Sequence, residues 1–176
     1  MGEQSVSTRH RVAWPTLAWV WQKPHRALGF GFGVGLIRPG SGTWGSALAL
    51  MLWWLFYSTF SFVTLGVLLV LMAVAGIWVC QRCVDDLQVP DHVGIVWDEM
   101  VSVWLVLWVL PAQWWIWLLG FALFRLFDVT KPPPIRHLDA HVQGGFGVML
   151  DDLIAAVYAI VGAWVVWWVV MMLGGQ

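Results

Sequence analysis

The sequence predicts an all-α integral membrane bundle with about five membrane segments, two hairpins plus a C-terminal helix. First, 60% of its 176 residues are hydrophobic and only 11% are charged, whereas soluble domains carry about 25% charged residues. Second, the mean hydropathy is +0.77 and apolar runs of membrane-helix length recur along the chain. Third, every Lys, Arg, Asp and Glu falls within residues 1–43, 81–99 or 125–152. Sixteen Trp residues fit the same class, because indole rings favour the lipid–water interface.

The first part of the chain is predicted to differ from the rest. Residues 1–28 are expected to be a cytoplasmic or interfacial leader, and residues 29–176 a single membrane-embedded domain. Basic residues flank a short apolar stretch in the leader, and no small-residue cleavage site follows it, unlike a cleavable signal peptide. Residues 12–21 would either lie flat on a membrane surface or belong to a disordered leader.

Five apolar segments are expected to be the membrane helices. They are residues 44–57, 62–80, 100–110, 112–124 and 148–173. A spanning helix needs about 20 apolar residues, which the second and last segments satisfy. The shorter segments need bilayer thinning or flanking residues, or do not cross fully. Pro111 interrupts the stretch from 100 to 124, which is therefore either one kinked helix or two short helices joined in a hairpin.

The distribution of charge favours the hairpin. The connections at 58–61 and 111–113 carry no charge, so pairing the first four apolar segments as two hairpins places all three charged stretches on one membrane face. A single span over 100–124 would instead leave the charged stretch 125–152 on the opposite face. The excess of Lys and Arg in cytoplasmic loops makes the charged face cytoplasmic.

The two cysteines form a lone Cys-X-X-Cys pair. A zinc site would need a second pair of ligands at suitable spacing, and the sequence has none for Cys80 and Cys83. A redox pair is the alternative, but two ordinary thiols at a helix end are the favoured interpretation.

Paired acids stand at the edges of two apolar runs. Asp98 and Glu99 precede the third segment, and Asp151 and Asp152 stand at the start of the last. Helix N-termini favour acids, so simple capping is one explanation. Capping needs one acid at a helix start and explains less well why both positions are acidic in both pairs. Each additional charge drawn towards lipid costs about 2.5–3.5 kcal/mol. Carboxylate oxygens suit Mg²⁺, and a metal site is the favoured interpretation.

A glycine-rich segment precedes the first apolar segment. Seven of the eighteen residues from 29 to 46 are Gly, and a helix could start near Thr43. Glycine lets backbone N–H groups approach an anion, to which a helix N-terminus adds a favourable field. A glycine-rich turn packed between helices is an equally good explanation. The candidate phosphate-binding residues are Arg38, Gly40, Gly42, Thr43 and Ser46.

A third group combines cations with an acid. Arg125, Lys131 and Arg136 bracket Asp128, so cations suited to phosphate stand near a further acid. The alternative is that these basic residues only extend their charges to the membrane surface. Several phosphatase chemistries are excluded, because neither cysteine has an Arg six residues on and the chain lacks a DxDx[TV] motif, a PSGH segment and a GxSxG elbow.

Four ordered motifs carry a resemblance to a known family. They are GFGVGL followed by GTWGS, then DHVGIVWDEM, then FRLFDVTKPPPIR, and finally GGFGVMLDD. Together, over about residues 29–160, they closely resemble the phosphatidylglycerophosphatase A family. The resemblance implies a multi-pass, Mg²⁺-dependent lipid phosphatase of the bacterial inner membrane that converts phosphatidylglycerophosphate to phosphatidylglycerol. The sequence departs from the family at Ser41, where Pro is usual, and at Gln143, where many members carry His or Pro.

The motifs and the resemblance together predict a role for each group. The four paired acids would hold Mg²⁺ at the cytoplasmic interface, where a lipid headgroup arrives. Arg125, Lys131 and Arg136, with donors from the glycine-rich segment, would stabilise charge on the transferring phosphoryl group. Asp128 would be the general base or a further metal ligand, and a covalent aspartyl-phosphate at this residue is the less favoured variant.

Two other classes of protein are alternatives. A small membrane transporter or channel using membrane-edge carboxylates would favour charges along the interior of its spans, and residues 62–80, 100–124 and 153–173 contain none. A non-catalytic membrane scaffold would leave the paired acids unexplained. The net charge of −1 says nothing about nucleic acid, but the sequence has no basic tract, so no nucleic-acid partner is expected.

Overall fold

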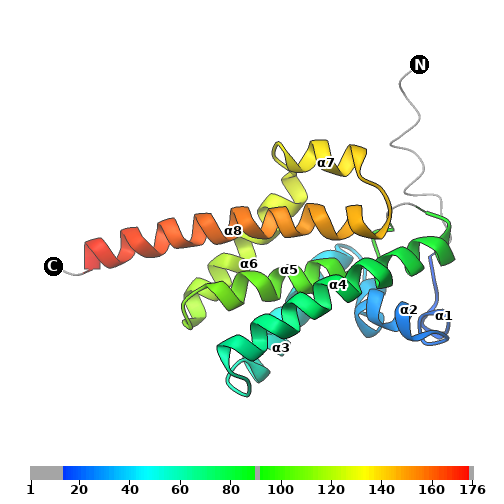
Figure 1. Ribbon diagram of the computed structural model, residues 1–176, viewed down its shortest axis with the longest axis horizontal. Coiled ribbons are helices and arrows are strands. Elements are labelled where there is room, and N and C mark those ends of the chain that lie inside the picture. The colour runs from blue at the N-terminus through cyan, green and yellow to red at the C-terminus, as the bar shows by residue number, and fades with distance from the viewer. Residues whose placement is uncertain (1–13, 90–91, 175–176) are drawn as a thin grey trace.

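In the computed structural model, residues 14–89 and 92–174 are described, except for the side chains of residues 139 and 140. They form a bundle of helices without β-strands (Figure 1). The first part of the predicted leader, including residues 12–13, lies outside the described residues. The elements in chain order are α1 (Leu17–Val20), α2 (Pro24–Gly29), the 3-10 helix η1 (Gly31–Leu36), α3 (Ser41–Phe56), α4 (Phe62–Leu87), α5 (Trp97–Val109), α6 (Trp114–Thr130), α7 (Ile135–His141) and α8 (Gly144–Gly174).

The five longest helices coincide with the five predicted apolar segments. The stretch around Pro111 is broken, so α5 and α6 are two helices packed against each other and not one kinked helix. Leu110 ends α5 in an extended conformation, with ψ 153°, because the residue before a proline disfavours helical geometry. Ser61 begins α4 as an N-cap whose hydroxyl accepts the Thr64 N–H at 3.1 Å.

Two of the described helices are long and apolar enough to cross a membrane. These are α4, with 26 residues, and α8, with 31 residues. The helices α3, α5 and α6 have 16, 13 and 17 residues and fall short of the usual length of about 20. Large apolar side chains are exposed along both long helices, as a lipid-facing surface requires. Examples are Val70 and Val74 on α4 and Val161, Val165 and Leu173 on α8.

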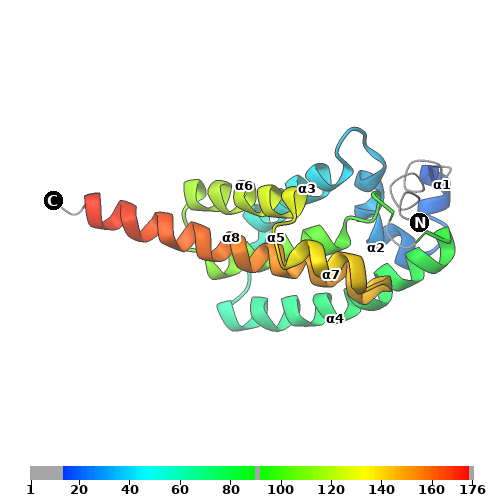
Figure 2. The same cartoon turned by 90° about the horizontal axis from the view of Figure 1, so that it is seen from above.

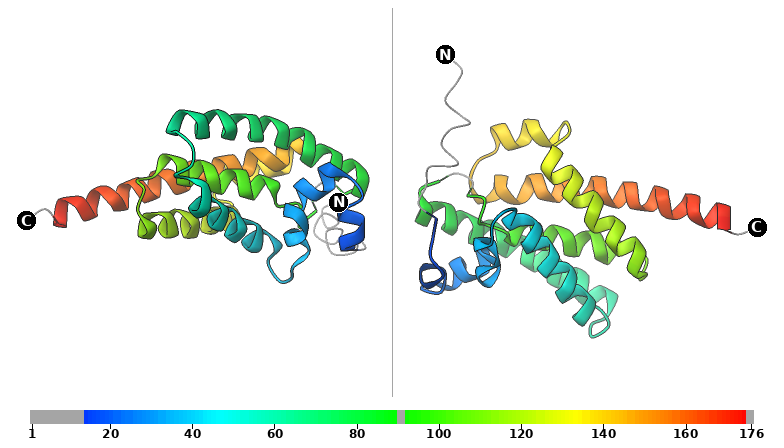
Figure 3. Two further views of the ribbon diagram at one scale, coloured as in Figure 1. Left: turned by 90° about the horizontal axis from the view of Figure 1, so that it is seen from below. Right: turned by 180° about the vertical axis from the view of Figure 1, so that it is seen from behind.

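The central element is α5, which packs against α3, α4, α6 and α8. Most of its side chains are buried, including Met100, Val103, Val106 and Leu107. Figure 2 shows α3 and α4 on opposite sides of the molecule, with α5 and α8 between them. The C-terminal part of α8 projects beyond the other helices, at the end opposite α1 and α2 (Figure 3).

Glycines fix the start of α8 against α4. A Cβ atom at Gly145 would collide with the backbone of Ile77 and Gln81 on α4. The Gly145 N–H also donates a hydrogen bond to the Gln81 side chain at 2.8 Å. A Cβ atom at Gly76 of α4 would collide with Met149 of α8 and Trp97 of α5, so these three helices lie in close contact at Gly76. The close approach sets where the acids of α8 lie relative to those of α5.

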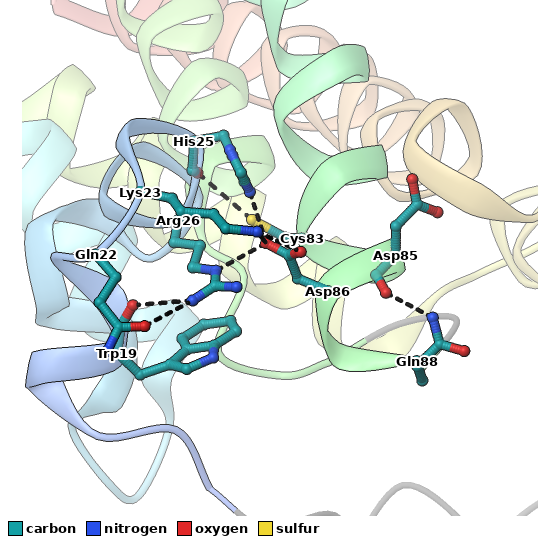
Figure 4. Close-up of polar contacts among 9 residues, drawn as sticks. All are labelled: Trp19, Gln22, Lys23, His25, Arg26, Cys83, Asp85, Asp86 and Gln88. Atoms are coloured by element: carbon teal, nitrogen blue, oxygen red, sulfur yellow. Dashed lines mark hydrogen bonds and ion pairs between the residues drawn. The ribbon is translucent and has the colours of Figure 1, made fainter.

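A network centred on Asp86 attaches α2 to the end of α4 (Figure 4). The Lys23 ammonium and the Arg26 Nε atom donate to the Asp86 carboxylate at 3.0 and 2.7 Å, and His25 Nε2 lies 2.7 Å from it. The Arg26 guanidinium also lies over the Trp19 ring, 3.9 Å from its centroid. Both helices are thereby joined on the same side of the bundle as the start of α5.

The two cysteines lie in the core beside this network. Cys80 and Cys83 are both fully buried, and the Cys83 thiol donates to the His25 carbonyl at 3.5 Å. Val79 and Gly29 pack around them. Their surroundings are those of structural thiols at a helix end.

The Asp86 network generates a prediction about stability. We expect Asp86→Asn to lower the thermal unfolding midpoint of the detergent-solubilised protein by several degrees. Hydrogen bonds to a charged group contribute about 1.5–3 kcal/mol each, and partial exposure of this site reduces that to about 1–2 kcal/mol for the network. The matched control is Asp85→Asn, because the exposed Asp85 carboxylate accepts a hydrogen bond from Gln81 at 2.8 Å and takes no part in the Asp86 network. Equal midpoints for the two variants would contradict a fastening role for Asp86.

Candidate functional site

The starts of α3, α5 and α8 and the end of α6 meet at one end of the bundle. The glycine-rich segment is held there by Ser41, whose hydroxyl donates to the Val93 carbonyl just before α5. This serine therefore links the glycine-rich segment to the segment that precedes α5. The Val96 N–H donates to the Gly29 carbonyl at 2.8 Å and joins the same two segments again.

The two acid pairs occupy different positions in their helices. Asp98 and Glu99 lie in the first turn of α5, where the helix dipole favours negative charge. Asp151 and Asp152 lie two turns inside α8, whose first turn holds no acid. Helix capping can therefore contribute at α5, whereas it does not explain the pair on α8. Asp98, Asp151 and Asp152 are all buried.

Arg125 joins three elements of the site. Its Nη1 atom donates hydrogen bonds to Glu99 at 3.0 Å and to the Ser46 hydroxyl at 3.4 Å, and it forms an ion pair with Asp128 at 2.7 Å. Ser46 is fully buried on α3, and Arg125 itself is largely buried. The guanidinium thus connects the glycine-rich segment, the acids of α5 and the end of α6. Among the described atoms, its buried Nε has no hydrogen-bond partner.

Lys131 brings the end of α6 to the acids of α8. It terminates α6 in a left-handed conformation, with φ 41°, and its ammonium pairs with the Asp151 carboxylate. The following proline-rich turn is held to α8 by the Tyr158 hydroxyl, which donates to the Pro133 carbonyl at 3.1 Å. Lys131 therefore projects from a constrained backbone.

Two glycines allow α3 to approach the start of α5. A Cβ atom at Gly42 would overlap the Glu99 carboxylate, and a Cβ at Gly45 would lie 2.6 Å from Val96 Cβ. Gly40 precedes the helix with φ 74°, a conformation that glycine adopts readily. The positive end of the α3 dipole consequently lies beside Glu99.

Asp152 is the most deeply placed acid. Its side chain is only 3% exposed, and its Oδ2 atom has no hydrogen-bond partner within the described part of the chain. The charges of Asp128, Asp98, Asp151 and Glu99 all act on it. Five carboxyl groups from three helices are therefore within electrostatic reach of one another.

The cluster carries more negative than positive charge. Five carboxyl groups stand against two cations in the described contacts, Arg125 and Lys131, which leaves an excess of three negative charges when all the groups are ionised. Like charges in a poorly solvated site repel strongly unless they are compensated. Retained protons or a bound cation would reduce this repulsion.

The donor chemistry of the cluster fits Mg²⁺, which prefers carboxylate oxygens. The buried Asp152 Oδ2 atom supplies an oxygen not engaged in a hydrogen bond within the described residues. In the described part of the chain, however, no group of three or more His, Cys, Asp or Glu side chains is arranged as a metal site. Glu99, Asp128 and Asp151 are instead paired with Arg125 and Lys131.

Three predicted site residues lie outside the cluster's contacts. Arg38 is exposed and lies over the Trp14 ring, 3.5 Å from its centroid. Arg136 is exposed on α7, and Thr43 is exposed on the first turn of α3. Among the described residues, no hydrogen bond or ion pair joins their side chains to the five carboxyl groups. The structure thus brings together the four paired acids, Asp128, Arg125, Lys131, Ser46 and Gly42.

Several polar residues near the site were missed by the sequence analysis. Ser102 is fully buried one turn beyond Asp98, and its hydroxyl has no hydrogen-bond partner in the described chain. The i, i+4 spacing from Asp98 was the available signal. Buried His92 accepts the Gly94 N–H at 3.0 Å and shapes the segment before α5. Gln81, which anchors α8, gave no signal because its contact is with a backbone group 64 residues away.

Comparison with curated proteins identifies three similar chains. A phosphatidylglycerophosphatase A of Haemophilus influenzae is 43% identical over 139 residues, covering 78% of this chain and 85% of that protein. A phosphatidylglycerophosphatase A of Escherichia coli is 41% identical over 136 residues, covering 76% and 78%. A putative phosphatidylinositol-3-phosphatase of Bacteroides thetaiotaomicron is 37% identical over 150 residues, covering 81% and 93%.

The family match extends over most of the helices and includes all the residues of the acid cluster. The family model described as phosphatidylglycerophosphatase A matches residues 27–167, from α2 to the last third of α8. No solved structure matches the chain. With a family match over most of its length and relatives above 40% identity, the chain belongs to the phosphatidylglycerophosphatase A family.

Proposed function

We propose that this protein hydrolyses the phosphate monoester of phosphatidylglycerophosphate, producing phosphatidylglycerol and phosphate for phospholipid biosynthesis. The observation that carries the proposal is the cluster in which Arg125 bridges Glu99, Asp128 and Ser46, and Lys131 reaches Asp151. Family membership supports the same reaction, since two bacterial relatives carry the name of this phosphatase. The apolar helices α4 and α8 suit an enzyme whose substrate stays in a bilayer.

The scissile phosphate is proposed to lie between the start of α3 and the two clustered cations. Backbone N–H groups in the first turn of a helix bind anions, and Gly42 places this turn against Glu99. The buried Arg125 Nε is a donor with no partner in the described structure, so it is available to a phosphate oxygen. Lys131 adds a second positive charge on the opposite side.

The acids are proposed to hold Mg²⁺ through Asp98, Glu99, Asp151 and Asp152. The gathering of carboxylates from α5 and α8 supports this assignment, because carboxylate oxygens suit Mg²⁺ and a cation among them would favour the approach of a phosphate dianion. When bound, Mg²⁺ would neutralise phosphate oxygens and favour deprotonation of an attacking water. Asp152, buried and with Oδ2 unbonded among the described residues, is the acid that most needs such compensation.

Asp128 is proposed to accept the proton of the attacking water. The water oxygen forms a bond to phosphorus, the bond from phosphorus to the glycerol oxygen breaks, and the departing oxygen takes up a proton. Arg125 orients the Asp128 carboxylate through its 2.7 Å ion pair. The same guanidinium stabilises negative charge that develops on the phosphoryl group.

The decisive test is phosphate release by the purified full-length protein in mixed micelles. We expect release from phosphatidylglycerophosphate in the presence of Mg²⁺ and its loss after chelation. Phosphatidylinositol 3-phosphate is the comparison substrate, because one relative is named for that lipid. A higher kcat/KM on the inositol lipid would replace the proposed substrate, and no release from either lipid would reject the proposed reaction.

The paired acids generate a second prediction. Glu99→Gln and Asp152→Asn keep side-chain size and remove one charge, so each should lower kcat at least 100-fold, about 2.7 kcal/mol of transition-state stabilisation. Both proteins should remain folded in detergent by circular dichroism. Asp85→Asn is the matched control, since Asp85 is exposed and lies outside the cluster. Near-normal turnover in either acid variant would remove that residue from the proposed metal site.

The clustered lysine generates a third prediction. Lys131→Ala should reduce kcat/KM at least tenfold, whereas Mg²⁺ affinity measured without lipid should change little. The control is Arg82→Ala, because Arg82 is an exposed cation on α4 that lies 5.7 Å over the Trp78 ring. A residue that only reaches the membrane surface would give equal, mild losses at both positions. That result would argue against phosphate binding by Lys131.

The topology proposed for the protein has five membrane segments in the bacterial inner membrane, with the acid cluster on the cytoplasmic side. All charged residues lie in three stretches on one face of this path. Reporter fusions in the loop following α4 and after Gln176 should therefore report opposite sides, the first cytoplasmic and the second external. Finding both reporters on one side would contradict the five-segment path.

A further inference from the structure

An apolar groove separates α3 from α4. The two helices pack against α5 but diverge from each other, so that α5 forms the floor of the space between them (Figure 2). The groove has a volume of about 240 Å³. Its lining side chains are all aromatic or aliphatic: Leu52, Trp53, Phe56, Tyr57, Phe60, Leu65, Leu68, Leu69, Met72 and Trp104.

The groove begins close to the acid cluster, farther along α3 and α5 towards the C-terminal end of each helix. On α3, Leu52 follows Ser46 by six residues, and on α5, Trp104 follows Glu99 by five. At 1.5 Å per residue, both separations are roughly 8–9 Å. The Trp104 indole N–H donates to the Ala49 carbonyl at 2.8 Å. This hydrogen bond fixes the Trp104 ring between the acid cluster and the groove.

This separation matches the geometry of a phospholipid. The polar layer of each leaflet is about 5–8 Å thick, because a bilayer of about 40–45 Å contains a hydrocarbon core of about 30 Å. A lipid phosphate beside Arg125 would therefore begin its acyl chain at the level of Trp104 and Leu52. We infer that the groove between α3 and α4 holds an acyl chain of the phospholipid substrate during hydrolysis, an inference that rests on the proposed function.

The lining favours an acyl chain over a protein segment. A peptide placed here would bury N–H and C=O groups against side chains that offer almost no hydrogen-bond partners. The α4 wall runs from Met72 to Leu65, roughly 10 Å, which accommodates several methylene groups in line with the bundle. A flexible hydrocarbon chain satisfies both the shape and the polarity of the space.

The role assigned to the groove is orientation of the substrate. Lipid tails are as apolar as leucine, so moving a chain from bilayer to groove contributes little affinity of its own. Packing one chain between two helices restricts the rotation and depth of the headgroup relative to Arg125 and Asp128. Small displacements of a reacting group cost large factors in rate. The groove should therefore affect kcat/KM for substrates long enough to reach it.

The test compares one substitution at two neighbouring positions of α4. Leu68→Trp fills the groove, whereas Leu71→Trp adds the same ring to an exposed position outside it. We expect the ratio of kcat/KM on dioleoyl to that on dihexanoyl phosphatidylglycerophosphate to fall about tenfold in Leu68→Trp. The ratio should stay within twofold of the parent value in Leu71→Trp. An unchanged ratio in Leu68→Trp, or an equal fall in both variants, would overturn the inference.

A second measurement detects the occupied groove without turnover. The probe is a phosphonate analogue of the substrate carrying a diazirine midway along one chain, in dodecyl maltoside micelles. Crosslinks should fall on groove residues such as Phe56 and Leu65 and be displaced by unlabelled phosphatidylglycerophosphate but not by phosphatidylcholine. Equal labelling of the outer positions Val70 and Val74, or equal displacement by both lipids, would indicate bulk lipid only and reject the inference.

The two proposals fail in different ways. If the parent protein releases no phosphate from either chain length, the proposed reaction is wrong, whatever the crosslinks show. If it releases phosphate but the crosslinks avoid the groove, only the acyl-chain assignment is wrong. Because Leu68→Trp could disturb the fold, its melting midpoint is compared with that of Leu71→Trp, and the crosslinks in the parent protein decide the question when the midpoints differ.

Discussion

The concentration of acidic side chains at one end of the bundle constrains the rest of this structure. Asp152 is buried within electrostatic reach of four other carboxyl groups, and their mutual repulsion is reduced by nearby positive charge or by retained protons. Arg125 and Lys131 supply part of it from the end of α6. The start of α3 adds its dipole, and only glycine at position 42 lets that helix reach Glu99. Phosphate chemistry is the use that best matches this combination.

The sequence predicted the helices well, because the signals for them are local. Apolar length marked all five long helices, and Pro111 marked the break between α5 and α6. The central position of α5 was not predicted. Its apolar residues surround the helix, so periodicity gave no buried face, and only the packing of four neighbours distinguishes it from a lipid-facing segment.

The sequence predicted which residues belong to the site better than it predicted which of them contact one another. The paired acids could be recognised in the sequence, and so could Arg125 and Asp128, which are three residues apart on one helix. The contact between Arg125 and Ser46 joins residues 79 positions apart, and no local sequence pattern predicts it. Arg136 shows the converse. It is close to Lys131 in sequence, yet α7 leaves it exposed while Lys131 turns towards Asp151. Sequence proximity identified candidates, and the packing of helices selected among them.

The unequal lengths of the helices set the position of the acid cluster along the bundle. At Gly76, α4 is level with Trp97, where α5 begins, so the last part of α4 extends past the start of α5. That extension is roughly 16 Å long and carries the Asp86 network that supports α2. The part of α4 below it is about 20 Å or more of apolar helix, close to the depth available in a thinned hydrocarbon core. In the topology proposed above, the first-turn acids of α5 stand near the surface of the bilayer, where a phosphate can arrive while its chains stay in lipid.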